Sequence, residues 1–481
     1  MSQENKINNQ LHNSPLRAEL IGFNNSSSGV VGNIRAIYFI GIGGIGMSAL
    51  ARYFHSKNVV VSGYDKTQTP LTKALEDIGI AIHYYEYVDG IPKDVNVVVY
   101  TPAIPANHAE LVYYQTHGYK VVKRSDILQM ISESSFNICI AGTHGKTTTT
   151  SMIAHILRHS GYGCNAFLGG IAANYNTNFW SSDNNVVVVE ADEYDRSFLK
   201  LSPDIAIITS MDADHLDIYG TAEEVENAFI QFSQKVKSGG CLITKYGLTR
   251  ANEFTVADHF TYSLHNNCAD VHVANLLVQN GSYKFDVLNQ HWTVLNMILH
   301  MGGLHNIENC IVAISVAKYL KIDDEKIRMA VADFKGVKRR FEYVSKNDKH
   351  ILIDDYAHHP TELTALISGV RSLFANKKLT LVFQPHLFSR TNDLADAFAE
   401  SLSLADEVIL LPIYPARELP IDGVTSEMIL NKMTLADKQV LAKEAMLEWM
   451  QVNKPELVVM AGAGDIDALL QPVNDILQQR I

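Results

Sequence analysis

The chain has 481 residues, of which 47% are apolar and 19% are charged, the balance of an ordinary soluble globular protein. At roughly 150 residues for each domain, this length predicts about three domains. The net charge of −12, from 40 Lys and Arg against 52 Asp and Glu, excludes the strongly basic surface by which proteins bind nucleic acid or anionic membranes.

The N-terminal segment and the cysteines indicate in which cellular compartment the protein is expected. Residues 1–32 are rich in Asn, Ser and Gln and lack the apolar stretch of a signal peptide, so we expect a polar, disordered leader over residues 1–33. No stretch approaches the roughly 18 consecutive apolar residues of a membrane span. The five cysteines show no C-x-x-C spacing, which favours reduced thiols in a reducing compartment. We therefore expect a cytoplasmic protein whose partners include neither nucleic acid nor a membrane.

A first α/β unit is predicted directly after this leader. An apolar run at 35–40 leads into a glycine cluster, a helical pattern at 47–57 and a second apolar run at 58–62, the order of a β–loop–α–β unit. The cluster at 41–46 reads GIGGIG and contains G-x-G-x-x-G, with Asp65 about 20 residues beyond it. Glycines at such a turn let N–H groups at a helix N-terminus approach a pyrophosphate. The motif by itself fits a dinucleotide, another diphosphate or a turn without a ligand.

The same order of elements returns in the second unit. A strand is predicted at 138–141, a loop at 142–147 and a helix at 148–159. The loop reads GTHGKT, and a Gly-Lys-Thr core in this position places a lysine on the β- and γ-phosphates and a hydroxyl on Mg²⁺. It departs from the usual phosphate-loop pattern, because Ile140 stands where the first glycine belongs. A chance Gly-Lys-Thr is the alternative, but the strand–loop–helix context favours a nucleoside triphosphate site.

Two polar segments follow the next apolar strands. The β-branched run at 186–189 ends on Glu190, and the run at 205–208 ends just before the sequence DADH at 212–215. Continuous Val and Ile runs are typical of parallel strands that are buried on both faces. Glu190 and His215 are therefore candidate metal ligands beside the phosphate loop. The alternative is that Glu190 only marks a strand end and that the histidine is structural.

The remainder of the second unit carries a hairpin signal and a pair of amides. Alternating apolar residues over 270–297, with Asn-Gly at 280–281, predict antiparallel hairpins appended to the sheet. The segment 303–309 reads GLHNxxN and precedes a helical stretch. Asn306 is either a helix N-cap or, together with Asn309, a group that reads an adenine edge. The residues alone do not separate these two interpretations.

A third α/β unit begins near residue 336. Its predicted strands are 351–353, 379–383, 408–411 and 457–460. Polar sequences follow the strands, among them DDYAHHP at 354–360 and QPHLFSR at 384–390, and ligands bind at such strand ends in open α/β sheets. The basic sequence GVKRRF at 336–341 precedes them. It is either a solvated charge run or a source of one basic side chain that reaches the phosphates when the domains close.

Taken together, these motifs resemble those of the Mur ligase family from residue 35 to the C-terminus. The matching sequences are, in chain order, GTHGKTTTT, EADE, ADHLD, HNxxN, RRFE, DDYAHHPTE and QPHxxSRT. The resemblance implies an α/β fold of three consecutive domains. These are a Rossmann-like UDP domain at 34–134, a P-loop ATPase-like central domain with appended β-hairpins at 135–334, and a Rossmann-like C-terminal domain at 335–481 that binds the amino acid.

The resemblance also implies a reaction. The third-unit motifs and the sequence GIGGIGM most resemble the family member that adds L-alanine to the lactoyl carboxylate of UDP-N-acetylmuramate. ATP and Mg²⁺ would convert this carboxylate into an acyl phosphate, which the alanine amine attacks, a step of peptidoglycan precursor synthesis. The family member that recycles a tripeptide is the alternative. From other classes, an NAD-dependent nucleotide-sugar dehydrogenase leaves the loop at 142–147 unexplained, and a P-loop regulatory module leaves the third unit without a role.

Individual residues receive roles from the same resemblance. The UDP-sugar would be bound by Gly43, Gly44, Gly46 and Asp65. ATP would be bound by Gly142, Thr143, His144, Gly145, Lys146, Thr147 and Thr148, with Asn306 and Asn309 at the adenine and Arg340 at the transferring phosphate. Mg²⁺ would be bound by Thr147, Glu190 and His215. The alanine or the acyl phosphate would contact His386 and Arg390, and the candidate general base is His359.

Overall fold

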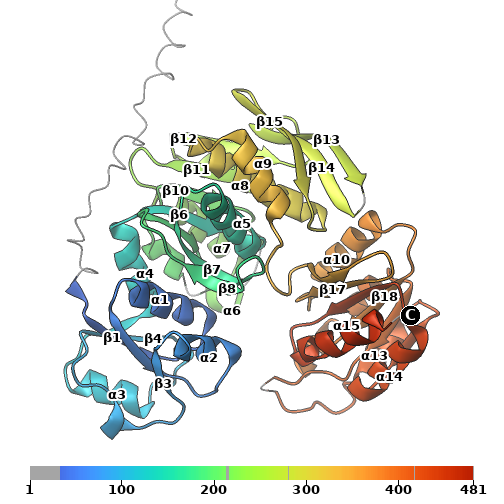
Figure 1. Ribbon diagram of the computed structural model, residues 1–481, viewed down its shortest axis with the longest axis horizontal. Coiled ribbons are helices and arrows are strands. Elements are labelled where there is room, and N and C mark those ends of the chain that lie inside the picture. The colour runs from blue at the N-terminus through green and yellow to red at the C-terminus, as the bar shows by residue number, and fades with distance from the viewer. Residues whose placement is uncertain (1–32, 195, 213–215, 280, 417, 480–481) are drawn as a thin grey trace, which may run out of the picture.

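Figure 1 shows a computed structural model of the chain, which describes residues 33–479 apart from 195, 213–215, 280 and 417. The described residues form three sheets of five, ten and six strands, which follow one another along the chain. The first unit (blue) and the third (orange to red) both adjoin the central unit. This arrangement confirms the predicted α/β fold of three consecutive units.

The first unit is a parallel sheet with helices packed on it. Its elements are β1 (Ala36–Ile40), α1 (Ile45–Ser56), β2 (Val60–Tyr64), α2 (Pro70–Glu76), β3 (Ala81–His83), β4 (Val97–Tyr100), α3 (Ala109–Thr116), β5 (Val121–Lys123) and α4 (Arg124–Glu133). The strands lie in the order β3-β2-β1-β4-β5, and all pairs are parallel. Gly41 takes φ +86°, a left-handed conformation that favours glycine. The chain therefore turns sharply from β1 into α1, as the glycine cluster predicts.

The central unit combines a parallel sheet with an antiparallel extension. Its elements are β6 (Phe136–Ala141), α5 (Lys146–His159), β7 (Asn165–Ala172), β8 (Thr177–Trp180), β9 (Val186–Glu190), β10 (Ile205–Ile208), α6 (Leu216–Tyr219), α7 (Ala222–Ser233), β11 (Cys241–Lys245), β12 (Asp258–Ser263), β13 (Val271–Gln279), β14 (Ser282–Asn289), β15 (Trp292–Leu299), α8 (Leu304–Tyr319) and α9 (Asp324–Asp333). The order is β15-β14-β13-β12-β11-β10-β6-β9-β7-β8. β13, β14 and β15 pair antiparallel, which confirms the predicted hairpins.

The third unit is a mixed sheet. Its elements are β16 (Glu342–Lys346), β17 (Ile351–Asp355), α10 (Pro360–Leu373), β18 (Leu379–Phe383), α11 (Phe388–Asp393), α12 (Ala395–Leu402), β19 (Glu407–Leu410), α13 (Ser426–Lys432), β20 (Lys438–Val440), α14 (Lys443–Asn453), β21 (Leu457–Ala461) and α15 (Leu470–Gln478). The order is β16-β17-β21-β18-β19-β20. Only the edge strand β16 runs antiparallel to its neighbour among these described strands. The polar segments after β17, β18 and β21 thus lie at one edge of the sheet.

The helix that follows the first glycine cluster packs on the central unit. The carboxamide of Asn178, in β8, donates to the Ile45 carbonyl oxygen at 2.6 Å and to Ser48 Oγ at 2.9 Å. Tyr53 packs its ring against Phe167 and Phe179 of the central sheet, with centroids 5.3 and 6.1 Å apart. These contacts set the first glycine-rich turn against the central unit.

The segment that links the second and third units runs along β7. The Lys338 N–H donates to the Ile171 carbonyl oxygen at 2.9 Å, and the Ala173 N–H donates to the Gly336 carbonyl oxygen at 3.0 Å. Phe341 then packs on Gly302, where any Cβ would overlap its ring. The linker is therefore held beside the central sheet before it enters β16.

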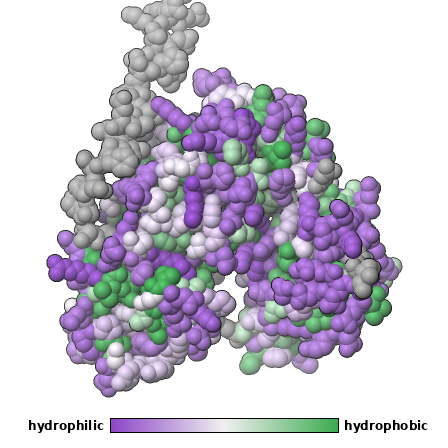
Figure 2. Space-filling model, in the orientation of Figure 1, coloured by the Kyte–Doolittle hydropathy of each residue, from purple (hydrophilic) through white to green (hydrophobic). Residues whose placement is uncertain are grey.

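The surface in Figure 2 is mostly hydrophilic on the face shown, with hydrophobic residues gathered over the first unit. Within the described residues, no helix is long and apolar enough to cross a membrane.

Candidate active site

The phosphate loop joins β6 to α5. Gly142 and Gly145 take φ values of +131° and +79°, which explains why glycine stands at both positions. Lys146 begins α5, and its Nζ donates to the Gly142 carbonyl oxygen at 2.6 Å and to Glu193 Oε1 at 2.7 Å. The two side chains are 14% and 2% exposed. Burial raises the pKa of Glu193, and Lys146 opposes that shift. The loop thus presents a lysine at a helix N-terminus, the arrangement that binds phosphate.

Two oxygen-bearing side chains lie beside this lysine. The Thr147 hydroxyl is 3.0 Å from both carboxylate oxygens of Glu190, which ends β9. Burial raises the pKa of Glu190, and Lys146 and Thr147 act against it. A hydroxyl and a carboxylate are donors that Mg²⁺ prefers, so this pair fits a magnesium site. The predicted third ligand, His215, lies outside the described residues. Among those described, no group of three His, Cys, Asp or Glu side chains surrounds a metal position.

Gly169 in β7 makes room for the Glu190 carboxylate, and we predict that Gly169→Ala lowers both turnover and stability. Any Cβ at this position would overlap the carboxylate and separate it from Thr147. We expect a loss of at least ~10-fold in turnover, equal to ~1.4 kcal/mol of transition-state stabilisation. We also expect about 1–3 kcal/mol of destabilisation from overpacking. ADP release and thermal unfolding measure the two effects.

Gly170→Ala is the matched comparison for that variant. A Cβ on Gly170 would lie 2.6 Å from Cγ1 of the buried Val337 and 3.1 Å from Cγ2 of Thr147, but it would not overlap the Glu190 carboxylate. Its loss of turnover should therefore be smaller, although overpacking should lower its stability as well. Equal losses in the two variants would contradict a specific requirement for space at Glu190.

The loop is fastened to the end of β10 by residues that the motifs do not include. The Ser210 hydroxyl lies 2.8 Å from Thr143 Oγ1 and accepts the His144 N–H at 2.8 Å. The Thr209 hydroxyl donates to the His144 carbonyl oxygen at 2.5 Å. The only sequence signal for these contacts is a pair of hydroxyl residues directly after a buried strand. Thr209 and Ser210 therefore hold the backbone of the phosphate loop in place by hydrogen bonds.

The amide pair lies directly behind the phosphate loop. Asn309 accepts a hydrogen bond from the Thr149 hydroxyl at 3.0 Å and donates to Asn306 Oδ1 at 3.1 Å. Asn306 donates to the Gly302 carbonyl oxygen at 2.6 Å. The N-cap of α8 is Gly303, so the N-cap interpretation of Asn306 is wrong. Both amides tie α8 to the start of α5, and adenine contact by them stays a prediction.

The first glycine cluster is hydrogen-bonded to Asp65, the acidic residue that follows β2. The Gly43 N–H donates to Asp65 Oδ2 at 2.7 Å, and Gly44 is the N-cap of α1. A Cβ on Gly46 would overlap the guanidinium of Arg124, so this glycine is needed to seat that side chain. The other side of the guanidinium lies 3.5 Å from Asp192. Arg124 thus stands between the first glycine cluster and the acidic segment that follows β9, and sequence reasoning missed it because nothing in its own segment marks it.

The third unit brings the predicted site residues His386 and Arg390 together with His358 and Tyr414. The His386 ring lies 6.1 Å from that of His358 and stacks on Tyr414 at 5.7 Å. His386 Nδ1 and Arg390 Nη1 are buried and have no hydrogen-bond partner within the described residues. The positive charge of Arg390 acts on His386, and two unpaired, buried nitrogens on these neighbouring groups suit an anionic group of a ligand.

His359 does not join this group. It is exposed and is the N-cap of α10, where its Nδ1 accepts the Thr361 N–H at 3.4 Å. Its neighbour His358 is the histidine of this pair that faces His386.

The two arginines of the basic cluster have different environments. Arg339 has φ +60°, and its guanidinium donates to the Gly462 carbonyl oxygen at 2.5 Å and lies 3.5 Å from Asp467. It therefore anchors the linker to the end of β21, and the interpretation of the cluster as a solvated charge run does not apply to it. Arg340 lies 5.4 Å from the Tyr356 ring and has no such anchor among the described residues.

The carboxyl groups of Asp354 and Asp355 lie close to these two arginines. Burial raises the pKa of Asp354 to about 7 and the pKa of Asp355 to about 6, and the arginines oppose both shifts. Asp355 accepts the N–H groups of Phe341 and Ala357, each at 2.7 Å. It thereby fixes the start of β16 to the end of β17.

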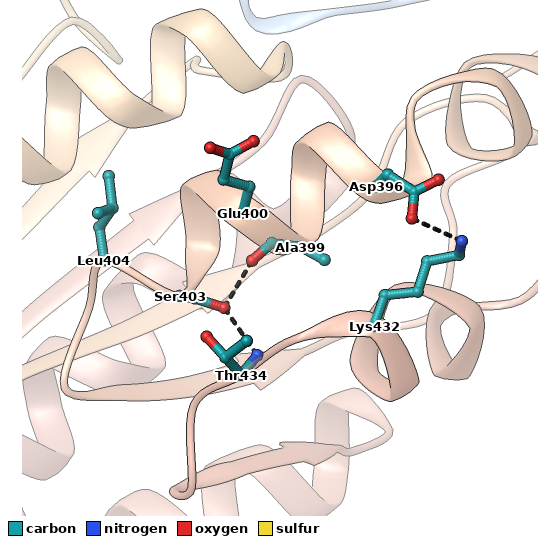
Figure 3. Close-up of a pocket in the computed structure, with 7 residues that line it drawn as sticks. All are labelled: Asp396, Ala399, Glu400, Ser403, Leu404, Lys432 and Thr434. Atoms are coloured by element: carbon teal, nitrogen blue, oxygen red, sulfur yellow. Dashed lines mark hydrogen bonds and ion pairs between the residues drawn. The ribbon is translucent and has the colours of Figure 1, made fainter.

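A pocket on α12 and α13 lies apart from all of these residues (Figure 3). It is lined by Asp396, Ala399, Glu400, Ser403, Leu404, Lys432 and Thr434. Its polar contacts are internal, such as the ion pair between Lys432 and Asp396 at 2.6 Å. No predicted site residue lines it, so it does not belong to the candidate active site.

Comparison with known proteins matches each unit to a family profile. The profiles are described as Mur ligase family, catalytic domain, at residues 36–135, Mur ligase middle domain at 140–317, and Mur ligase, glutamate ligase domain, at 339–464.

Curated relatives match over nearly the whole chain. The UDP-N-acetylmuramate–L-alanine ligase of Cytophaga hutchinsonii is 46% identical over 460 residues, which cover 93% of this chain and 98% of that protein. The ligase of the same name from Parabacteroides distasonis is 46% identical over 458 residues, 94% and 99% of the two chains.

Solved structures match as well. The UDP-N-acetylmuramate–alanine ligase of Thermotoga maritima has a TM-score of 0.77 at 27% identity and covers 93% of this chain and 100% of its own. A murein peptide ligase from Psychrobacter arcticus has a TM-score of 0.62 at 22% identity, covering 93% and 99%, which supports the fold alone.

Proposed function

The chain belongs to the Mur ligase family, and from that premise we propose that it joins L-alanine to the lactoyl carboxylate of UDP-N-acetylmuramate in an ATP-dependent reaction of peptidoglycan precursor synthesis. The products are UDP-N-acetylmuramoyl-L-alanine, ADP and phosphate. The observation that carries this proposal is 46% identity to alanine-adding ligases over 93% of the chain. The phosphate loop with Lys146 and Glu190 supports it independently, because a nucleotide-sugar dehydrogenase has no use for such a loop.

Phosphoryl transfer takes place between two anions, so neutralisation of charge dominates the catalysis. Lys146 contacts the β- and γ-phosphates, and Arg340 reaches the transferring phosphate from the linker. Thr147 and Glu190, with His215, would hold Mg²⁺, which would neutralise phosphate charge. Support for this assignment is the 3.0 Å contact of the Thr147 hydroxyl with both Glu190 oxygens.

The two substrates occupy the flanking units in this proposal. The turn at Gly43, Gly44 and Gly46 faces the UDP diphosphate, and Asp65, which accepts the Gly43 N–H at 2.7 Å, lies on the uridine side. His386 and Arg390 bind the carboxylate of alanine or the acyl phosphate, supported by their unpaired buried nitrogens. Water would hydrolyse the acyl phosphate, so the three units must close around it.

The domain limits and the compartment are part of the same proposal. We assign the UDP domain to 34–134, the ATP domain to 135–334 and the amino-acid domain to 335–481, since each range contains one of the three sheets. We assign the protein to the cytoplasm, where its four buried cysteines and exposed Cys268 would remain thiols.

Release of ADP with a panel of acceptors tests the proposed function. With UDP-N-acetylmuramate and ATP present, we expect ADP release to depend on L-alanine and to be far weaker with the recycled tripeptide, and a panel of other single amino acids measures how strictly alanine is selected. Preference for the tripeptide would favour the recycling ligase. ADP release that is independent of the UDP-sugar would contradict ligation.

A further inference from the structure

The orientation and the tautomer of the His358 ring are set by a hydrogen bond to a backbone carbonyl oxygen. His358 Nδ1 lies 2.8 Å from the Tyr356 carbonyl oxygen and 3.5 Å from Glu362 Oε2. A carbonyl oxygen only accepts, so Nδ1 carries the proton. In the neutral ring, Nε2 is then the nitrogen with the free lone pair. Glu362 is itself held in place by the N–H groups of His358 and His359, at 2.9 and 3.2 Å.

The surroundings of His358 keep this ring neutral. Burial lowers the pKa of His358, and the positive charges of Arg390 and Arg340 lower it further. Glu362 and the hydrogen bond to the Tyr356 carbonyl act in the opposite direction but do not reverse the shift. The facing ring of His386 also has a lowered pKa, through burial and Arg390. Near pH 7 the lone pair on Nε2 is therefore available to take a proton.

An amino acid seated on the unpaired nitrogens would place its amine near this ring. Its carboxylate suits His386 Nδ1 and Arg390 Nη1, which are buried and unpaired among the described residues. The amine is only one carbon atom removed from that carboxylate. The His358 ring centre lies 6.1 Å from the His386 ring centre, a separation that matches the short span between the carboxylate and the amine of an α-amino acid.

We propose that His358, and not His359, is the general base that takes a proton from the ammonium group of the incoming amino acid. This inference rests on the proposed function and names a catalytic residue for it. A proton moves from the ammonium nitrogen to Nε2, which leaves a neutral amine and an imidazolium whose Nδ1–H still donates to Tyr356. The amine nitrogen forms the C–N bond at the acyl carbon. The C–O bond to the phosphoryl group breaks, and phosphate leaves with that electron pair and the second amine proton. The imidazolium then returns its proton to water.

The decisive variant is His358→Asn. The asparagine amide can still donate to the Tyr356 carbonyl, as Nδ1 does, but it has no group in the place of Nε2. We expect alanine-dependent ADP release at pH 7 to fall ~100-fold or more, the lower end of the range for general-base catalysis. Turnover of the variant should rise with pH as alanine loses its proton in solution. Wild-type turnover should instead fall only when the pH drops through the lowered pKa of His358, because protonation removes the base.

Hydroxylamine separates this role from a structural one. It is already neutral at pH 7, so it needs no base to attack the acyl phosphate. With hydroxylamine in place of alanine, we expect His358→Asn to form the acyl hydroxamate within about two-fold of the wild-type rate, a change of less than ~0.5 kcal/mol. His265→Gln, at an exposed histidine of the central unit, is the control for substitution of a histidine as such.

Each outcome decides between the alternatives. Unchanged alanine turnover and pH profile in His358→Asn would overturn the proposal. An equal loss with hydroxylamine would also overturn it, because the residue would then position the acyl phosphate. A loss in His359→Gln in place of His358→Asn would return the role to His359. If the wild-type chain formed neither product, the proposed function itself would fail.

Discussion

Lys146→Ala should lower ligase turnover by at least ~100-fold, the scale for removing one group that stabilises charge in the transition state. Binding of UDP-N-acetylmuramate should be unchanged, because Gly43, Gly44 and Gly46 lie between β1 and α1 of the first unit, whereas Lys146 lies in the central unit. Lys146 stands at the start of α5, 2.6 Å from the Gly142 carbonyl oxygen, where a phosphate loop needs its lysine. Single-turnover ADP formation and calorimetric titration with the UDP-sugar measure the two quantities.

The same variant also breaks a buried ion pair, so its stability must be controlled. Glu193 is 2% exposed and loses this ion-pair contact, which can cost up to about 3–5 kcal/mol. Lys237→Ala is the matched control. Lys237 pairs with Asp204 at 2.7 Å, at the opposite end of β10 from the phosphate loop. It should lose stability and keep its turnover. Near-normal turnover in Lys146→Ala would contradict the ATP assignment.

Glu190→Ala and His215→Ala should respond differently to magnesium. Both carboxylate oxygens of Glu190 lie 3.0 Å from the Thr147 hydroxyl, and if this carboxylate bridges two Mg²⁺ ions, its loss should lower turnover by at least ~100-fold. Excess Mg²⁺ should then not restore turnover, because the carboxylate would also balance the charge between the two ions. His215 is predicted to bind one ion through an imidazole, which Mg²⁺ exchanges readily for water. His215→Ala should therefore raise the magnesium requirement and be partly rescued.

Turnover against free Mg²⁺ at constant ATP is the measurement for both variants. Thr147→Ala serves as a third point, since it should weaken Mg²⁺ binding while leaving Glu190 in place. Equal rescue of Glu190→Ala and His215→Ala would argue against a bridging carboxylate. Wild-type metal dependence in His215→Ala would remove this histidine from the metal site.

Local sequence was sufficient for the long apolar strands and for the two glycine-rich turns, whereas β7, β8 and β20 were not predicted. Val186, Val187, Val188 and Val189 form a buried strand because β-branched side chains pack on both faces of a parallel sheet. Gly142 and Gly145 occupy left-handed conformations that favour glycine, so the loop between β6 and α5 could be recognised from its letters. Both features depend on the backbone of a few consecutive residues. The resemblance to a family then connected the three units.

Side-chain pairing between distant segments was decided only by the tertiary structure. His358 and His359 are adjacent in the sequence, yet the first faces His386 and the second caps α10. Arg339 and Arg340 are likewise equivalent by composition, and only the contact with Gly462 makes the first an anchor. Neighbouring residues in a loop point in different directions, and which of them meets a partner depends on segments far along the chain. The local sequence pattern determines where a polar loop lies along the chain. The packing of the sheets determines which side chains of that loop face a ligand site or a distant partner.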